Sequence, residues 1–124
     1  METYISDHKI SIKSGYVLVE RPQDYQVDLD DLPTMFVELA NFCREARCRK
    51  VLIYGDRTKV NLEVMDIFEL GKELAKLHLQ IAMVESHDAS DDDVDFLENV
   101  TINRGGRIRF FDTQRDAKDW LGVS

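Results

Sequence analysis

Two cations and a hydroxyl stand together between an apolar run and a segment with helical periodicity. Arg57, Thr58 and Lys59 follow the apolar run at residues 51–54 and precede the helical pattern. The free amides at the start of a helix, next to two positive side chains, are suited to a phosphate or a carboxylate. We therefore predict that any bound anion contacts Arg57, Thr58 or Lys59. The alternative is an idle, solvated turn, because charged loops are ordinary and this one lacks the glycines of a phosphate-binding loop.

Acidic residues gather between residues 85 and 98, where several carboxylates could hold a hard cation such as Ca²⁺. An EF-hand loop needs glycine at its sixth position, which is Asp93 when counted from Asp88 and Phe96 when counted from Asp91. Negative charge also stabilises the start of a helix, so we interpret the cluster as capping and solubilising charge. Its members are Glu85, Asp88, Asp91, Asp92, Asp93, Asp95 and Glu98.

Other side chains that often carry chemistry are scattered along the sequence. Cys43 and Cys48 would point about 140° apart on a helix, so we predict two reduced, structural thiols rather than a disulfide. The histidines His8, His78 and His87 occur singly, and we interpret His78 as a structural residue in the apolar face of a helix. No nucleophile signature such as Gly-x-Ser-x-Gly occurs, and no two acids are recognisable as a general acid and base. We therefore predict no catalytic residue, no metal and no cofactor.

The length and the charge of the chain restrict its class. A chain of 124 residues is the size of one domain, which we expect to span residues 1–124. The net charge of -8 repels the phosphates of nucleic acids and anionic membrane surfaces. The first residues lack a basic segment followed by an apolar one, and no apolar run approaches the ~18 residues that a membrane span requires. We predict an acidic, cytoplasmic protein that binds no nucleic acid and has no membrane span.

The apolar residues alternate between strand and helix periodicity along the chain. Residues 4–12 and 16–19, separated by turn residues 13–15, predict a β-hairpin. After it, crossover connections place the strands in parallel with helices on the sheet faces, giving the order ββαβαβαβα and a mixed five-stranded sheet. The expected strands are 51–54 and 81–84, both central, and 107–111, and the expected helices are about 30–47, 61–78, 91–103 and 112–121.

The second helix carries an apolar arc wider than contact with one sheet requires. Its apolar residues cover about half of the circumference, whereas packing on one sheet uses a stripe of about 100°. Leu62 and Met65 lie toward the polar side and extend this surface, and Gly71 lets another backbone approach. We predict a homo-oligomer that associates through Leu62, Met65 and Gly71. The alternative is that other helices of the same chain cover the whole arc.

Two segments resemble a known family of bacterial proteins. They are Ile-Ala-Met-Val-Glu at residues 81–85 and Gly-Arg-Ile-Arg-Phe-Phe-Asp at residues 106–112, the latter followed by Ala117, Trp120 and Leu121. These look like the SpoIIAA-like, STAS/SEC14-type domains, and the predicted element order agrees with that family. The resemblance implies an α/β fold of the STAS-like type.

The better-known relatives that the chain resembles are anti-sigma-factor antagonists. They carry a phosphorylatable serine in an Asp-Ser-Ser/Ala-Gly motif at the start of the helix after the central strand. Here residues 55–61 read Gly-Asp-Arg-Thr-Lys-Val-Asn, so the serine motif is absent and Thr58 is the nearest hydroxyl apart from Tyr54. The resemblance favours a non-enzymatic regulatory or protein-interaction module. The alternatives are a carrier of a small apolar or lipid-like ligand, which SEC14-type relatives imply, and an enzyme with an unrecognised site.

Overall fold

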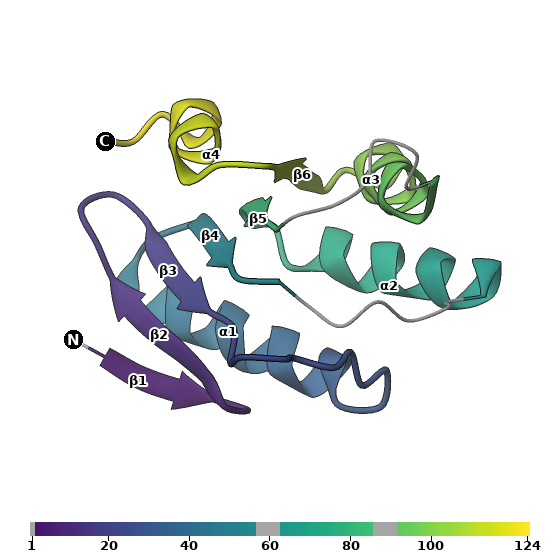
Figure 1. The fold of residues 1–124 in the computed structure, drawn as a ribbon, viewed down its shortest axis with the longest axis horizontal. Coiled ribbons are helices and arrows are strands. Elements are labelled where there is room, and N and C mark those ends of the chain that lie inside the picture. Colours follow the sequence, from purple (N-terminus) through teal and green to yellow (C-terminus); the bar gives the residue numbers. More distant parts are fainter. Residues whose placement is uncertain (1, 57–62, 86–91) are drawn as a thin grey trace.

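In the computed structural model, which describes residues 2–56, 63–85 and 92–124, six strands form one sheet in the order of the chain (Figure 1). The strands are β1 (Glu2–Ile5), β2 (His8–Ile12), β3 (Val17–Glu20), β4 (Lys50–Tyr54), β5 (Gln80–Val84) and β6 (Arg107–Phe111). Strands β1 to β3 pair antiparallel, and β3 to β6 pair in parallel. The predicted α/β class, with 51–54 and 81–84 in interior parallel strands, is confirmed.

Helices connect the parallel strands and follow the last one. They are α1 (Leu32–Ala46), α2 (Val64–Lys76), α3 (Asp92–Asn103) and α4 (Gln114–Leu121). Each begins and ends within a few residues of the predicted range. The start of α2 has a capping box in which the Glu63 side chain and the Asp66 side chain each accept from the other's backbone N–H. Thr113 accepts from the Asp116 amide at 3.2 Å and caps α4.

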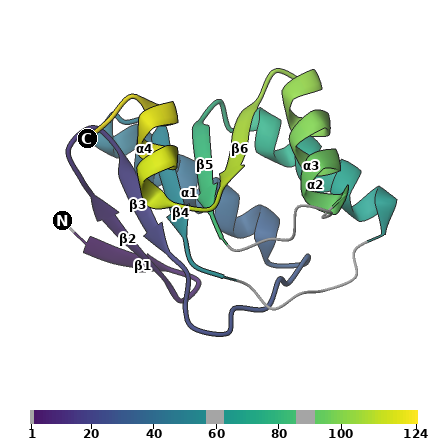
Figure 2. The ribbon, with the colours of Figure 1, turned by 45° about the horizontal axis from the view of Figure 1, so that its top comes forward.

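The sheet buries a different set of side chains on each face. Successive residues of a strand point to opposite faces, so Val51 and Ile53 join one cluster while Leu52 joins the other. The larger cluster includes residues of α1, α2 and α3, and the smaller one includes residues of α4. Figure 2 shows α4 and α1 on opposite sides of the sheet. Both faces of the central strands are therefore covered, which explains their continuous apolar sequences.

The sheet has six strands where the sequence predicted five, so that prediction was wrong in one detail. The expected strand at residues 4–12 is divided by a two-residue turn at Ser6 and Asp7, whose φ angles are 46° and 68°. Left-handed backbone at both central residues is typical of the tight hairpin turn that joins two antiparallel strands. Neither residue is glycine or asparagine, the usual signal for this turn, which is why the sequence pattern did not reveal it.

Two residues of the α2 region differ from their predicted roles. His78 lies just beyond the helix, exposed and with a φ of 55°, so it is not part of an apolar helix face. Gly71 is buried against α3 of the same chain, where an added Cβ would lie 2.6 Å from Cγ1 of Val100. The neighbour that Gly71 allows to approach is therefore α3 of the same chain, through the side chains of Val100 and Thr101, and not a helix of a second copy, which corrects its assignment to an oligomer interface.

Candidate ligand pocket

The carboxyl ends of three parallel strands meet at one edge of the sheet. The Arg21 amide donates to the Tyr54 carbonyl at 2.9 Å, and the Gly55 amide donates to the Val84 carbonyl at 3.1 Å. These bonds continue the ladders of β3, β4 and β5 by one residue, so that Arg21, Gly55 and Glu85 each follow the end of a neighbouring strand. Ligands of open α/β sheets bind beyond this edge.

A buried ion pair joins the ends of β3 and β5 across β4. Arg21 Nη1 donates to Glu85 Oε2 and to the Gly55 carbonyl, the latter at 3.1 Å. The two charged side chains are only 8% and 2% exposed. Gly55 has a φ of +123°, and a Cβ there would lie 3.0 Å from Cβ of Arg21. Glycine is therefore required at the end of β4 so that Arg21 can lie across it.

His8 is a further buried polar residue, and it lies close to Arg21 through their shared neighbour Tyr25. It is 1% exposed, and its Nδ1 lies 2.9 Å from the Ser6 carbonyl oxygen. Its ring packs edge-on against Tyr25 at 4.7 Å, and the Arg21 guanidinium lies 5.5 Å from the centre of the Tyr25 ring. Burial, with a smaller contribution from the positive charge of Arg21, holds the pKa of His8 below its ordinary value of 6.5. The imidazole is therefore neutral near pH 7.

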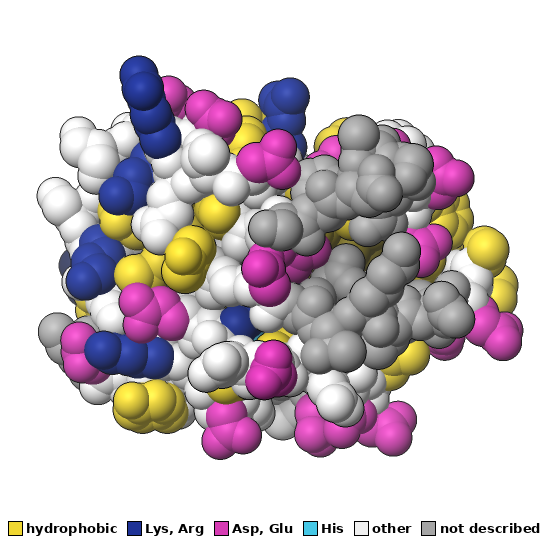
Figure 3. Space-filling view, in the orientation of Figure 1, with side chains coloured by type: hydrophobic (Ala, Val, Ile, Leu, Met, Phe, Trp, Pro, Cys, Tyr) yellow, Lys and Arg dark blue, Asp and Glu magenta, His cyan; other side chains and the backbone are white. Residues whose placement is uncertain are grey.

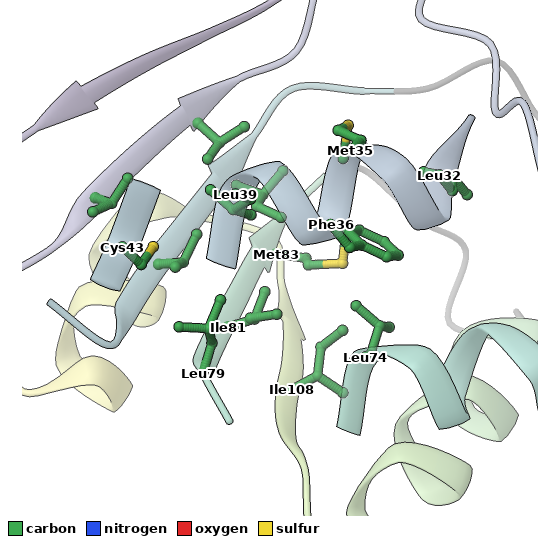
Figure 4. Packing of buried hydrophobic residues seen from close by; sticks show 14 of the residues in the cluster. Leu32, Met35, Phe36, Leu39, Cys43, Leu74, Leu79, Ile81, Met83 and Ile108 are labelled. Atoms are coloured by element: carbon green, nitrogen blue, oxygen red, sulfur yellow. The ribbon is translucent and has the colours of Figure 1, made fainter. Parts of the chain in front are cut away.

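An apolar pocket of about 60 Å³ lies between these polar groups and the larger core cluster. Figure 4 shows Phe36 of α1 next to Met83 of β5, with Leu74 of α2 on the same side of the sheet. Eleven of the fourteen lining residues are apolar, and the polar ones are His8, Arg21 and Tyr25. The apolar members are Val27, Leu32, Met35, Phe36, Ile53, Leu70, Leu74, Ile81, Met83, Leu97 and Phe110.

A wider, open hollow lies outside the pocket. His8, Tyr25, Leu32 and Met35 line both spaces and form the wall between them. The outer hollow has a volume of about 560 Å³ and carries four acidic residues, Asp7, Asp24, Asp28 and Asp31. A neutral molecule could enter from this side without the repulsion that an anion would meet.

The predicted site residues are not brought together in this pocket. Arg57, Thr58, Lys59 and Leu62 lie outside the described residues, so the anion site stays a prediction. Met65 is 64% exposed near the start of α2. The pocket's polar residues, His8, Arg21 and Tyr25, were missed, although His8 has the same parity in β2 as the buried Ile10.

The acidic cluster divides into two parts in the structure. Glu85, which was assigned to solvated capping charge, is instead buried in the ion pair with Arg21, which corrects that interpretation. Asp92, Asp93 and Asp95 lie in the first turn of α3, as expected for residues that favour a helix start. Asp88 and Asp91 lie outside the described residues. Among the residues the structure describes, no group of three His, Cys, Asp or Glu side chains is placed to hold a metal ion.

The two cysteines lie away from the pocket. Cys43 is buried, and burial raises the pKa of its thiol to about 12. Cys48 is half-buried, and its Sγ lies 3.5 Å from the Lys50 carbonyl oxygen. Such a protonated, buried Cys43 packs as a small apolar side chain rather than acting as a nucleophile.

A solved structure shows the same architecture. It is the crystal structure of an uncharacterized protein of the DUF3478 family from Shewanella loihica PV-4, described as having a SpoIIAA-like fold. The TM-score is 0.52 at 20% sequence identity, and the match covers 98% of this chain and 90% of that chain. The chain has a SpoIIAA-like fold. The resemblance in residues 81–85 and 106–112 is confirmed at the level of the fold.

The SpoIIAA-like fold does not by itself assign an activity to this chain, because one fold can have many functions. The similar protein is described as uncharacterized, and its description indicates no enzymatic family. No family model matches the sequence, and no curated protein matches it.

Within the described ranges, none of the helices has the length and apolarity needed to cross a bilayer. In Figure 3 the Lys and Arg side chains facing the viewer lie mainly on the side of β2, β3 and α4, while Asp and Glu dominate the opposite side.

The first prediction concerns the buried ion pair. Glu85→Gln leaves the Arg21 charge buried without its carboxylate, and we expect it to lower the free energy of unfolding by about 3 to 5 kcal/mol. The double variant Arg21→Met with Glu85→Leu should recover most of that loss, because neither buried charge remains. Urea denaturation followed by circular dichroism measures both.

The exposed pair of Lys9 and Glu2, 3.6 Å apart, provides the control. We expect Glu2→Gln to change the free energy of unfolding by less than about 1 kcal/mol, as is usual for surface pairs. Equal losses from Glu85→Gln and Glu2→Gln would contradict the importance of the buried pair.

The second prediction concerns the pH dependence of stability. The folded pKa of His8 lies below the unfolded value of 6.5, so the unfolded chain binds a proton first as the pH falls. The free energy of unfolding should therefore decrease below pH 6.5, until the pH passes the folded pKa. Denaturation curves at a series of pH values should show that His8→Phe removes this part of the slope. His78→Asn, which replaces an exposed imidazole in a left-handed position, should retain it.

Proposed function

We propose that the chain is a non-enzymatic binding module that holds a small apolar ligand in the pocket between the sheet and helices α1 to α3. The supporting observation is the pocket itself, which is lined by apolar side chains from three helices and the sheet and has three polar lining residues, His8, Arg21 and Tyr25. Apolar walls with a few placed polar groups are the usual composition of small-molecule sites. This favours the carrier alternative among the functions that the sequence suggested.

The pattern of shifted pKa values gives no support to an enzyme. Among the described residues, clear shifts occur at His8, Asp31 and Cys43. Asp31 precedes α1 and Cys43 lies near its other end, so these groups belong to opposite ends of a 15-residue helix. A catalytic site is expected to gather such groups in one cleft. His8 and Asp31 both line the outer hollow, but the pKa of the exposed Asp31 is raised mainly by the charge of the neighbouring Asp28, so its shift reflects its own loop rather than a catalytic cleft.

The third prediction tests the pocket directly. Leu97 of α3 lines it and is half-buried, so Leu97→Phe should fill it. Native mass spectrometry of freshly purified protein should detect a retained small molecule on the wild type and none on Leu97→Phe. The control Ile102→Phe adds the same bulk at an exposed position of the same helix and should retain the ligand. A wild type with no adduct, which also binds no added short-chain alcohol or ether, would overturn the proposal.

A second function, protein interaction through α2, is favoured by a separate observation. Val64 and Met65, in the first turn of α2, are 67% and 64% exposed. Two adjacent large apolar side chains in solvent are a feature of contact surfaces, whereas isolated ones are ordinary. We propose that this turn is where the chain self-associates, a role for which Gly71 is no longer needed.

The fourth prediction tests self-association. Met65→Glu places a charge in the proposed contact, so a wild-type dimer seen by sedimentation should dissociate in this variant while its circular dichroism stays native. Val37→Glu, a change at an exposed apolar position of α1, should leave the dimer intact. A wild type that sediments as a monomer at tens of micromolar would show that the α2 turn does not bind a second copy.

A further inference from the structure

We infer that the pocket selects a small, uncharged molecule that donates a hydrogen bond, such as an alcohol, to Nε2 of His8. This inference rests on the proposed binding function and specifies its ligand class. It follows from the tautomer of His8, the missing partner of Nε2 and the pairing of Arg21.

The tautomer is fixed by the short turn between β1 and β2. Nδ1 of His8 lies 2.9 Å from the Ser6 carbonyl oxygen, and a carbonyl oxygen can only accept. Nδ1 therefore carries the proton. Because burial keeps the imidazole neutral near pH 7, Nε2 is left with a lone pair and acts as an acceptor.

The acceptor is buried and unsatisfied. In the part of the chain that the structure describes, His8 Nε2 is the buried side-chain atom without a hydrogen-bond partner. Such an atom carries a cost on the order of 1 kcal/mol or more, which a suitable donor removes. His8 lines the apolar pocket, so we place the donor group of a pocket ligand at this nitrogen.

The charges around the pocket favour a neutral ligand. Arg21 Nη1 is directed at Glu85 and at the Gly55 carbonyl. An anionic group would compete with Glu85 for this guanidinium, and a cationic group would be repelled by it. A hydroxyl avoids both costs, since it is uncharged and its proton can be directed at Nε2.

The size of the pocket restricts the ligand further. A cavity of about 150 Å³ accommodates benzene, and this pocket has about 60 Å³. The ligand is therefore a molecule of a few non-hydrogen atoms, with some extra room supplied by rearrangement of Met35 and Met83, whose unbranched side chains adapt easily. The rival occupant is a buried water, which could also donate to Nε2.

The experiment compares two isomers, 1-butanol and diethyl ether, which contain the same atoms. Both can accept a hydrogen bond, but only the alcohol can donate one. Each is titrated into the wild type while the methyl NMR signals of Met35 and Met83 are followed. We expect the alcohol to bind about fivefold or more tightly than the ether, which corresponds to satisfying one buried acceptor. In His8→Phe the two isomers should bind equally, because the acceptor is gone.

The outcomes separate this inference from the proposed function. Equal binding of the two isomers to the wild type overturns the hydrogen-bond requirement and leaves the apolar pocket intact. Failure of both to bind means that the pocket holds water alone and overturns the inference, while native mass spectrometry of the purified protein tests the binding function separately. A second measurement needs no variant: the ¹⁵N NMR signals of His8 should show a protonated Nδ1 and an unprotonated Nε2, and the reverse assignment would overturn the inference.

Discussion

The buried pair of Arg21 and Glu85 is the constraint around which this end of the molecule is arranged. It places two opposite charges in the interior, where each would be costly alone, and so the two residues must be brought together by the fold. They follow strands that are not neighbours, since β4 lies between β3 and β5. The pair can form only when all three strands are in register, with Gly55 leaving room for Arg21 to cross. Such a contact favours one alignment of the sheet over its alternatives.

The same pair determines what the pocket can bind. A guanidinium whose charge is already paired with a buried carboxylate is a poor anion site, so the polar end of the pocket carries no uncompensated charge from Arg21. His8 is held nearby by the Ser6 turn, and its neutral ring contributes an acceptor rather than a charge. The pocket thus combines apolar walls with one unsatisfied acceptor, which is a more restricted chemistry than an apolar cavity alone provides.

The sequence could predict the interior strands but not the pocket. Strands β4 and β5 are apolar on both faces, so four consecutive apolar residues revealed each of them. The pocket's polar residues come from β2 and from the segment after β3, and Glu85, which pairs with Arg21, follows the end of β5. None of these segments has a distinctive motif. In the sequence, His8 is a single histidine with no motif around it, and Glu85 is one member of an acidic cluster. Their roles depend on long-range pairing, which local patterns do not encode.

The helix that was expected to bind a partner also lines the pocket, and this connects the two proposed functions. Leu70 and Leu74 line the pocket, while Val64 and Met65 are exposed at the start of the same helix. Since α2 is also packed closely on α3 at Gly71, a shift of α2 would be resisted by that contact. A ligand could therefore influence the exposed turn only if it binds two positions of α2 with different affinity. Under that condition ligand binding in the pocket and protein interaction through α2 would be coupled, because the bound ligand would determine the position of the exposed turn with Val64 and Met65.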